Sequence, residues 1–252
     1  KITAGTLSLS SATALQNSRF DTTSVAGSAS AGLKIATPSL SLGGLTGSNS
    51  FESRFNTTSS VLYSGLTTLT FNTLANTTMA YSGGLADNGN GMTLTMNGGG
   101  TQLLNGTNAY TGLTTVNGGT LGSGTGFSGA VTAATGGILS PGASAGAFGT
   151  LAISDAGASA LTLNGGYLQM DVSTASNDLI AVTGNTVLSG TNTVVLNPTT
   201  GVAAGSYDLV TYAAKTGAGS VVFANGSTTL GNATLAVNAG SIQMTVGAGD
   251  LN

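Results

Sequence analysis

Short runs in which apolar and polar residues alternate, each ended by Gly or Asn, restrict this chain to β-structure. Residues 92–96 read Met-Thr-Leu-Thr-Met and residues 242–246 read Ile-Gln-Met-Thr-Val, and similar runs recur along the sequence. Alternation at period two places one set of side chains on an inner face and leaves Thr, Ser and Gln on the other face. Gly interrupts these runs too often for helices to form. The pattern therefore predicts an all-β fold.

The turns between these runs indicate how the strands are connected. Asn-Gly pairs, which favour tight turns, occur seven times, at Asn88, Asn90, Asn97, Asn105, Asn117, Asn164 and Asn225. A turn ending in Gly, one further residue and then an apolar residue recurs at Gly119, Gly137 and Gly166, with unequal steps between them. Such an irregular period, with about 20 residues per coil plus insertions, is typical of a parallel β-helix. An antiparallel sandwich and an up-and-down barrel share the short strands and remain alternatives.

The composition excludes several classes of function. The 252 residues include no His, Cys or Trp, only five Lys or Arg and eight Asp or Glu, so charged residues make up 5% of the chain. An ordinary soluble domain has about 25%. Few groups are therefore left for proton transfer or metal binding, and a net charge of -3 argues against nucleic acid as a partner. A hydrophobic fraction of 40% and a mean hydropathy of +0.30 predict an ordered chain.

The sequence shows no targeting or membrane-spanning segment. It has no apolar run long enough for a spanning helix and no basic start followed by an apolar stretch. We therefore expect no transmembrane segment, and any signal peptide to have been removed already.

Residues 94–121, LTMNGGGTQLLNGTNAYTGLTTVNGGTL, resemble the autotransporter-associated β-strand repeat, also called the passenger-associated transport repeat. The preceding residues 81–85, YSGGL, and the following residues 139–146, LSPGASAG, are similar to segments that flank such repeats. The resemblance is clearest over residues 77–146 and looser to residue 212. The matching positions are Gly100, Thr101, Leu104, Gly106, Asn108, Tyr110, Gly112, Thr114 or Thr115, Val116, Gly119, Thr120 and Leu121.

The resemblance implies a right-handed parallel β-helix (β-solenoid) forming a single elongated domain, exported by a bacterium to the cell surface or beyond. Residues 77–252 would form the solenoid with autotransporter-type repeats, and residues 1–76 would form N-terminal coils or a cap. The sequence departs from the family pattern at Met96, where a Lys is frequent, and at Gln102-Leu103, which disturbs the alternation. Only one full copy of the repeat is clear.

Acidic residues are the only candidates for catalysis or metal binding. Asp171 and Asp178 are close in sequence, as the carboxyl pair of a polysaccharide-cleaving β-helix would have to be in space. No Lys or Arg lies between Arg54 and Lys215 to bind an acidic sugar. Asp155, Asp171, Asp178 and Asp208 lack the spacing of a calcium loop. We predict that the chain is not an enzyme and has no catalytic, cofactor or metal site.

Three Thr-x-Thr pairs, Thr68/Thr70, Thr93/Thr95 and Thr191/Thr193, are the pattern from which a flat ice-binding face could be built. Such a face requires the pairs to lie in register on successive coils. Their irregular spacing argues against that register, so we interpret them as ordinary solvent-facing strand positions.

The two ends of the chain suggest self-assembly. A strand that includes Lys1, Ile2 and Leu7 begins the sequence, and a strand that includes Ile242, Met244 and Val246 lies near its end. Neither end shows a capping helix, a Pro block or a charge cluster, so both are expected to be open sheet edges that pair with copies of the same chain.

The first functional prediction is therefore an extracellular structural protein whose solenoid subunits stack head to tail into a surface fibre or filament. The second is an adhesin or passenger domain that binds a surface or a glycan. The third is a polysaccharide-active β-helix enzyme.

Overall fold

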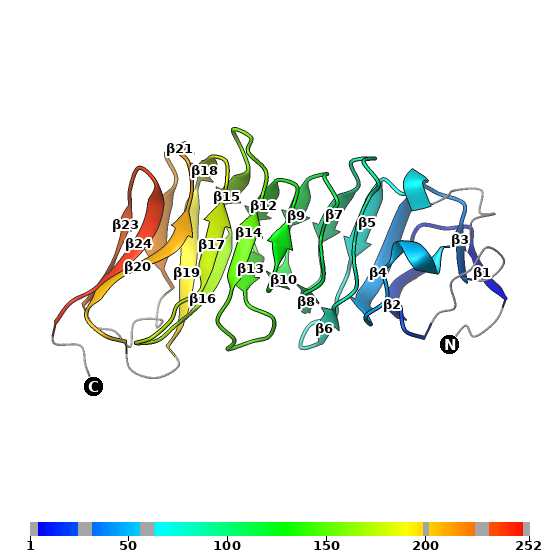
Figure 1. The fold of residues 1–252 in the computed structure, drawn as a ribbon, viewed down its shortest axis with the longest axis horizontal. Helices are drawn as coiled ribbons and strands as arrows, with labels where there is room; N and C mark the ends of the chain where they lie inside the picture. The colour runs from blue at the N-terminus through cyan, green and yellow to red at the C-terminus, as the bar shows by residue number, and fades with distance from the viewer. Residues whose placement is uncertain (1–4, 25–31, 56–62, 199–201, 225–231, 249–252) are drawn as a thin grey trace.

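The computed structural model describes residues 5–24, 32–55, 63–198, 202–224 and 232–248 of the chain. These residues form 24 strands and two short 3-10 helices, stacked into one elongated β-solenoid (Figure 1). The all-β solenoid predicted from the alternating runs and the Gly turns is confirmed, and the sandwich and barrel alternatives are excluded.

Three sheets form the walls of the solenoid. The nine-stranded sheet contains, in spatial order, β2 (Leu15–Asp21), β4 (Ser39–Thr46), β5 (Thr68–Phe71), β7 (Thr93–Met96), β9 (Thr114–Val116), β12 (Val131–Ala134), β15 (Leu161–Asn164), β18 (Thr186–Ser189) and β21 (Lys215–Thr216). The seven-stranded sheet contains β6 (Thr78–Tyr81), β8 (Thr101–Leu104), β10 (Gly119–Ser123), β13 (Gly137–Pro141), β16 (Tyr167–Val172), β19 (Thr191–Pro198) and β22 (Ser220–Phe223). The six-stranded sheet contains β11 (Gly126–Phe127), β14 (Thr150–Ile153), β17 (Leu179–Val182), β20 (Gly205–Thr211), β24 (Ser241–Val246) and β23 (Ala233–Val237).

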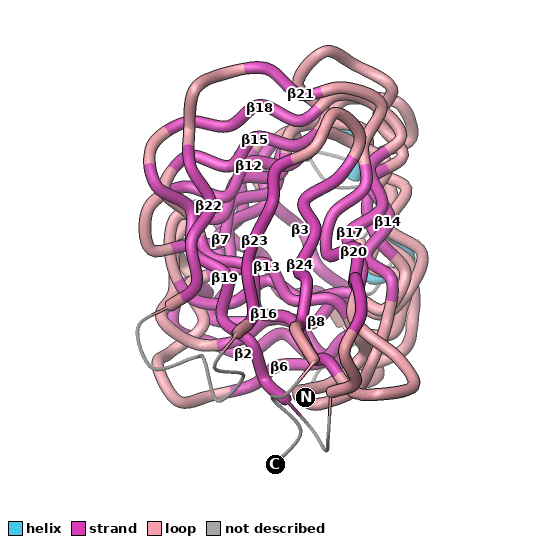
Figure 2. The backbone as a smooth tube through the Cα atoms, turned by 90° about the vertical axis from the view of Figure 1, so that its left-hand side faces the viewer, coloured by secondary structure: helices cyan, strands magenta, loops and turns pink. Residues whose placement is uncertain are grey.

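From β9 onward each coil visits the three sheets in turn, whereas no described strand before β11 belongs to the six-stranded sheet. The chain passes from β9 to β10 to β11 and then returns to β12, which lies beside β9. All described ladders between these strands are parallel except those that β24 makes with β20 and β23. Figure 2 looks onto the C-terminal end of the stack and shows the strands arranged around its cross-section.

The first coils lie at the N-terminal end. A two-stranded parallel sheet joins β1 (Thr6–Leu9) to β3 (Gly32–Ile35), and the 3-10 helices η1 (Glu52–Arg54) and η2 (Tyr63–Gly65) follow in the next coil. Because β2, β4 and β5 belong to the same nine-stranded sheet as the later strands, the described part of residues 1–76 continues the solenoid. Four rings, Phe20, Phe51, Phe55 and Tyr63, pack edge to face near these helices, with centroids 4.8 to 5.9 Å apart.

The recurring Gly motif marks equivalent corners of successive coils. Gly119 is the direct ladder partner of Gly137, and Ile138 pairs with Tyr167, the residue after Gly166. At Gly119 the backbone has φ +64, and a Cβ atom would lie 2.2 Å from the carbonyl oxygen of Gly98. No side chain fits between coils at this corner, which explains the Gly.

Coil length varies, as the unequal steps between the recurring Gly residues indicated. The ladder places Thr115 beside Thr132 and Thr132 beside Thr162, so the second of these coils is much longer than the first. The additional residues lie in corner loops, such as residues 142–149, and leave the strands aligned. The nine-stranded sheet is about 40 Å across, because it has eight spacings of about 4.8 Å.

This alignment shows that irregular spacing in sequence was a wrong argument against register for two of the three threonine pairs. Thr68 and Thr70 stand in register with Thr93 and Thr95 on the next strand, although the spacing in sequence is irregular. The third pair differs, because Thr193 lies in the seven-stranded sheet beside Tyr167.

Stacked apolar side chains fill the interior. Each inward position of the strands forms a column that runs along the stack. One column comprises Leu42, Phe71, Met96, Val116, Ala133, Leu163 and Leu188, all at most 1% exposed. Burial of one such large side chain contributes about 1.5–3 kcal/mol.

Gln102, where the sequence breaks its alternation, is a buried polar bridge. It lies in β8 and is 0% exposed. Its Oε1 accepts a hydrogen bond from the Leu45 N–H at 2.9 Å, and its Nε2 donates to the Leu45 carbonyl at 2.9 Å. Gln102 therefore satisfies both backbone polar groups of Leu45 in β4, which lies in another coil.

Candidate functional site

The N-terminal assembly residues are only partly described. Lys1 and Ile2 lie outside the described residues. Leu7 lies in β1 and packs, half-buried, against the core, whereas its ladder partner Leu33 in β3 is 0% exposed. β1 is paired on one side only within the described residues.

The C-terminal assembly residues are buried instead of forming an edge. Ile242, Met244 and Val246 are 0%, 0% and 2% exposed. Their strand, β24, pairs on one side with β20 and on the other with β23. The chain folds back in a hairpin, closed by a hydrogen bond from Asn238 N–H to the Ser241 carbonyl. The open edge that we expected along Ile242–Val246 therefore lies along β23.

The end of the stack exposes core-facing side chains. In β22, Phe223 is half-buried, whereas its ladder partner Val194 in β19 is 0% exposed. In β23, Leu235 is half-buried, whereas its partner Met244 is fully covered. Partly buried apolar residues packed against the core are Leu7, Leu15, Tyr207, Val221, Phe223, Ala233, Leu235 and Val237. All of these except Tyr207 lie in strands at one end of the solenoid or the other.

Asp171 and Asp178 form the pair of acids that the sequence singled out. Asp171 lies in β16 and Asp178 immediately before β17, and they are 4% and 0% exposed. Asp178 Oδ2 accepts the Asp171 N–H and its Oδ1 accepts the Gly149 N–H, both at 2.8 Å. Burial raises the pKa of the Asp178 carboxyl to about 6, although these two hydrogen bonds act in the opposite direction.

This carboxyl pair joins two corner loops. The Asp178 N–H donates to the Asp171 carbonyl, and the Leu179 N–H donates to the Gly149 carbonyl. Both oxygens of Asp178 are held by backbone donors, and Asp171 Oδ1 is buried with no hydrogen-bond partner among the described residues. Because both carboxyls are covered by the protein itself, the arrangement gives no support to polysaccharide cleavage.

The other two acids weighed as calcium ligands, Asp155 and Asp208, make separate local contacts. Asp155 Oδ1 accepts the Gly157 N–H in a local turn, and Asp208 Oδ1 accepts a hydrogen bond from Gln243. Within the described ranges, no group of three or more acidic, His or Cys residues could hold a metal ion.

Asp87 is a buried acid that the sequence analysis missed. It is 3% exposed and accepts hydrogen bonds from the N–H groups of Gly89, Met92 and Thr111 and from the Thr111 hydroxyl. Burial alone would raise the pKa of Asp87, but these hydrogen bonds hold it below its usual value. Asp87 therefore fastens one coil to the next. The only sequence feature that marked Asp87 was the Asp-Asn-Gly run at residues 87–89, and this run indicates no more than a turn.

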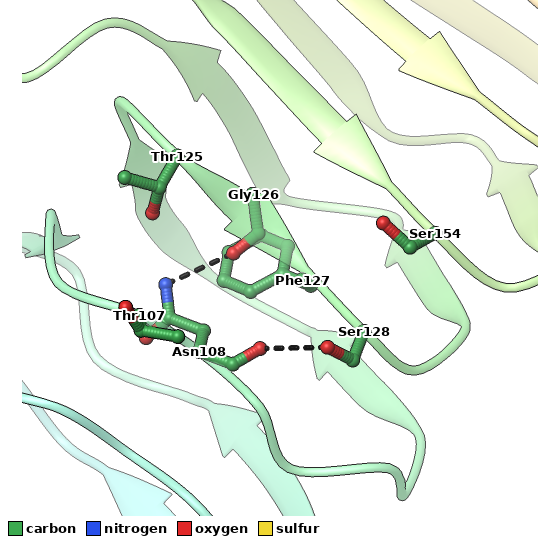
Figure 3. A pocket seen from close by; sticks show the side chains of 7 residues that line it. All are labelled: Thr107, Asn108, Thr125, Gly126, Phe127, Ser128 and Ser154. Carbon is green, nitrogen blue, oxygen red and sulfur yellow. Dashed lines mark hydrogen bonds between the residues drawn. The ribbon is translucent and has the colours of Figure 1, made fainter.

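A small polar hollow lies beside β11, the first strand of the six-stranded sheet (Figure 3). It has a volume of about 180 Å³ and is lined by Thr107, Asn108, Thr125, Gly126, Phe127, Ser128 and Ser154. Asn108 Nδ2 donates to the carbonyls of Leu104 and Gly126, both at 2.9 Å. The lining has no charged group, so the hollow lacks a general acid or base.

No protein-family model and no curated protein matches this chain. Among the described residues, no helix is long and apolar enough to cross a membrane.

Proposed function

We propose that the chain is a bacterial extracellular structural protein whose solenoid stacks head to tail with copies of itself into a surface fibre or filament. The observation that carries this proposal is that apolar, core-facing side chains are partly exposed to solvent at both ends of the described stack. A repeat protein whose last coil leaves apolar side chains half-exposed needs a further surface to cover them. The resemblance of residues 94–121 to the passenger-associated repeat supports the extracellular location.

Backbone groups at the ends also support stacking. β21, β22 and β23 are the outermost described strands of the three sheets at the C-terminal end. In a parallel sheet, the backbone N–H groups of successive residues in a strand point alternately toward the neighbouring strand on one side and toward the neighbouring strand on the other. The N–H groups of Ser220 and Ala224 donate back into the stack, so those of Val221 and Phe223 point away from it. A second copy would satisfy them by adding strands.

Electron microscopy and sedimentation velocity on the purified chain test the proposal. We expect rods several times longer than the roughly 40 Å of one stack. A chain that stays monomeric at high concentration would overturn self-assembly and assign the exposed ends to another partner, such as a further coil of a longer chain.

Two substitutions on one strand sharpen the test. Val221→Lys places a charge on a half-buried, core-facing position of β22, whereas Val222→Lys places it on the outward face, where Val222 is already 41% exposed. We expect Val221→Lys to abolish filaments and Val222→Lys to preserve them, with circular dichroism confirming that both variants fold. Filaments of equal length from both variants would contradict end-to-end stacking.

The second candidate is an adhesin or passenger domain that binds a glycan. Tyr167 favours it, because this ring is 37% exposed on the outer face of the seven-stranded sheet, between Ile138 and Thr193. An exposed ring can stack on a sugar. Saturable binding on a glycan array that Tyr167→Ala removes would support this function, and an array without hits would refute it.

A further inference from the structure

One outward row of the nine-stranded sheet consists of threonines. Thr70, Thr95, Thr115, Thr132 and Thr162 are ladder partners in succession on β5, β7, β9, β12 and β15. We call these five residues the threonine row. These strands lie side by side along the solenoid in Figure 1.

The row belongs to a wider array. Thr68 and Thr93 pair with each other two residues before the row. Ser41 precedes the row on β4, and Val187 and Thr216 follow it on β18 and β21. Strand geometry spaces the hydroxyls about 4.8 Å apart along the row and, on β5 and β7, about 6.6 Å apart along the strand.

The hydroxyls of the row are available to a ligand. All five side chains are half-exposed. Within the part of the chain that the structure describes, their hydroxyl groups make no hydrogen bond to another residue, whereas the neighbouring Thr93 hydroxyl donates to the Thr67 carbonyl. The row therefore presents hydroxyl and methyl groups at a fixed repeat.

The face is free of charge from β4 to β18. No charged residue occupies an outward position of the described strands of this sheet between Ser39 and Ser189. A charged side chain would hold its own hydration shell and would be costly to strip of water. A neutral face meets a neutral surface without that cost.

We propose that the threonine row is an ice-binding surface, whose ligand is crystalline water. A single hydroxyl contact with water contributes little, because liquid water replaces it equally well. A row of hydroxyls that a backbone ladder holds at one spacing differs from a single hydroxyl, because a periodic crystal surface can contact all the hydroxyls of the row at the same time. An ice surface is neutral and periodic, and the row repeats at one spacing over five successive strands.

The comparison with the neighbouring wall favours ice over a glycan as the ligand of this face. The outward row of the seven-stranded sheet reads Thr101, Thr120, Ile138, Tyr167 and Thr193, so an aromatic ring and a branched apolar side chain interrupt it. The threonine row contains no aromatic residue on which a sugar could stack.

The test measures thermal hysteresis and inhibition of ice recrystallisation by the purified chain. The unsubstituted protein should shape ice crystals and slow their growth. Thr115→Lys, at the centre of the row, should remove this activity. Thr120→Lys, the same change on the outward face of β10, should retain it. Thr95→Lys provides a second variant in the row, and circular dichroism verifies folding of each.

Absence of hysteresis and of ice shaping in the unsubstituted protein would overturn the proposal. Equal activity in folded Thr115→Lys and Thr120→Lys would also overturn it, because the activity would then not belong to this face. The inference does not depend on filament formation: Val221→Lys, which blocks stacking, should keep the ice activity of a single subunit.

Discussion

Asp178 should make the protein less stable as the pH rises from about 4 to about 6. Its carboxyl is completely buried, and burial raises its pKa from 3.8 to about 6. The folded state therefore binds the proton more tightly than the unfolded state does. The resulting stability is fully present below the unfolded pKa and is lost as the pH rises through the folded pKa. The difference between the two pKa values corresponds to at most about 3 kcal/mol, of which about 2 kcal/mol is lost between about pH 4.5 and pH 7.5.

Other carboxyls with displaced pKa values act at lower pH. The pKa values of the Asp21 and Asp87 carboxyls are lowered from the ordinary value of 3.8. The stability that these two groups contribute is therefore present above pH 3.8 and is lost as the pH falls through their folded-state pKa values. Above about pH 4.5 their contribution is nearly complete. A decline above that pH therefore reports on Asp178.

Asp178→Asn should remove the decline and introduce a constant cost. An amide keeps one acceptor oxygen, so either the Gly149 N–H or the Asp171 N–H loses its partner. Leaving one buried N–H unsatisfied costs about 1–3 kcal/mol. The variant should be less stable than the unsubstituted protein at about pH 4.5, and the difference should nearly vanish at about pH 7.5.

Guanidinium unfolding followed by far-ultraviolet circular dichroism measures both effects. Asp155→Asn removes the same charge at another turn and controls for net charge. The reasoning would be refuted by a free energy of unfolding that stays constant or rises between about pH 4.5 and pH 7.5. It would equally be refuted if Asp178→Asn retained the decline.

Four further substitutions test the stack itself, each by the free energy of unfolding in guanidinium. Gln102→Leu leaves the buried N–H and carbonyl of Leu45 without partners and should cost about 2–5 kcal/mol; an unchanged midpoint would contradict the bridge. Gly119→Ala forces a Cβ to within 2.2 Å of a backbone oxygen and should cost at least about 3 kcal/mol. Gly89→Ala, also at positive φ but with nothing within 4 Å, should cost only about 1–2 kcal/mol, so equal effects would refute the steric argument. Leu94→Ala opens a cavity in a fully buried column and should cost about 2–5 kcal/mol, and a smaller loss would show that the coils collapse around the gap.

Strand positions and coil corners were predictable from the sequence because both follow local rules. Alternation marks the inward residues, and the Gly at 119 and 137 is required by the close approach of adjacent coils. The number of residues per coil was less predictable. Loops of any length can leave a corner and return to the next strand, since each doubling of loop length costs only about 0.6 kcal/mol.

That freedom explains the error on the threonine pairs. We read spacing in sequence as spacing in the structure, but residues inserted at corners do not shift the ladder. Thr115, Thr132 and Thr162 are successive ladder partners, although the second step along the chain is much longer than the first. Only the pairing of the strands reveals the row.

The error at the C-terminal end has a different origin. Residues 242–246 alternate in the same way as every other strand, and alternation does not encode the direction of a strand or its neighbours. The antiparallel return of β24 between β20 and β23 arises from the turn at residues 238–241. The roles of Asp87 and Gln102 in linking coils were missed for a related reason, because their hydrogen-bond partners lie on other coils, far away in sequence.

The two proposals concern perpendicular directions of one solenoid, and this makes them separable. Stacking involves the ends of the solenoid, where Val221 and Leu235 are only partly buried. Ice binding involves the nine-stranded sheet on its side, where Thr115 lies. A charge at Val221 should abolish filaments and leave ice activity, and a charge at Thr115 should do the reverse. If copies stack in continuous register, each adds its own threonine row in the same direction, so filaments should inhibit ice growth more strongly per subunit than the Val221→Lys monomer. Equal inhibition per subunit would show that the rows of neighbouring copies are not aligned, even if both proposals hold separately.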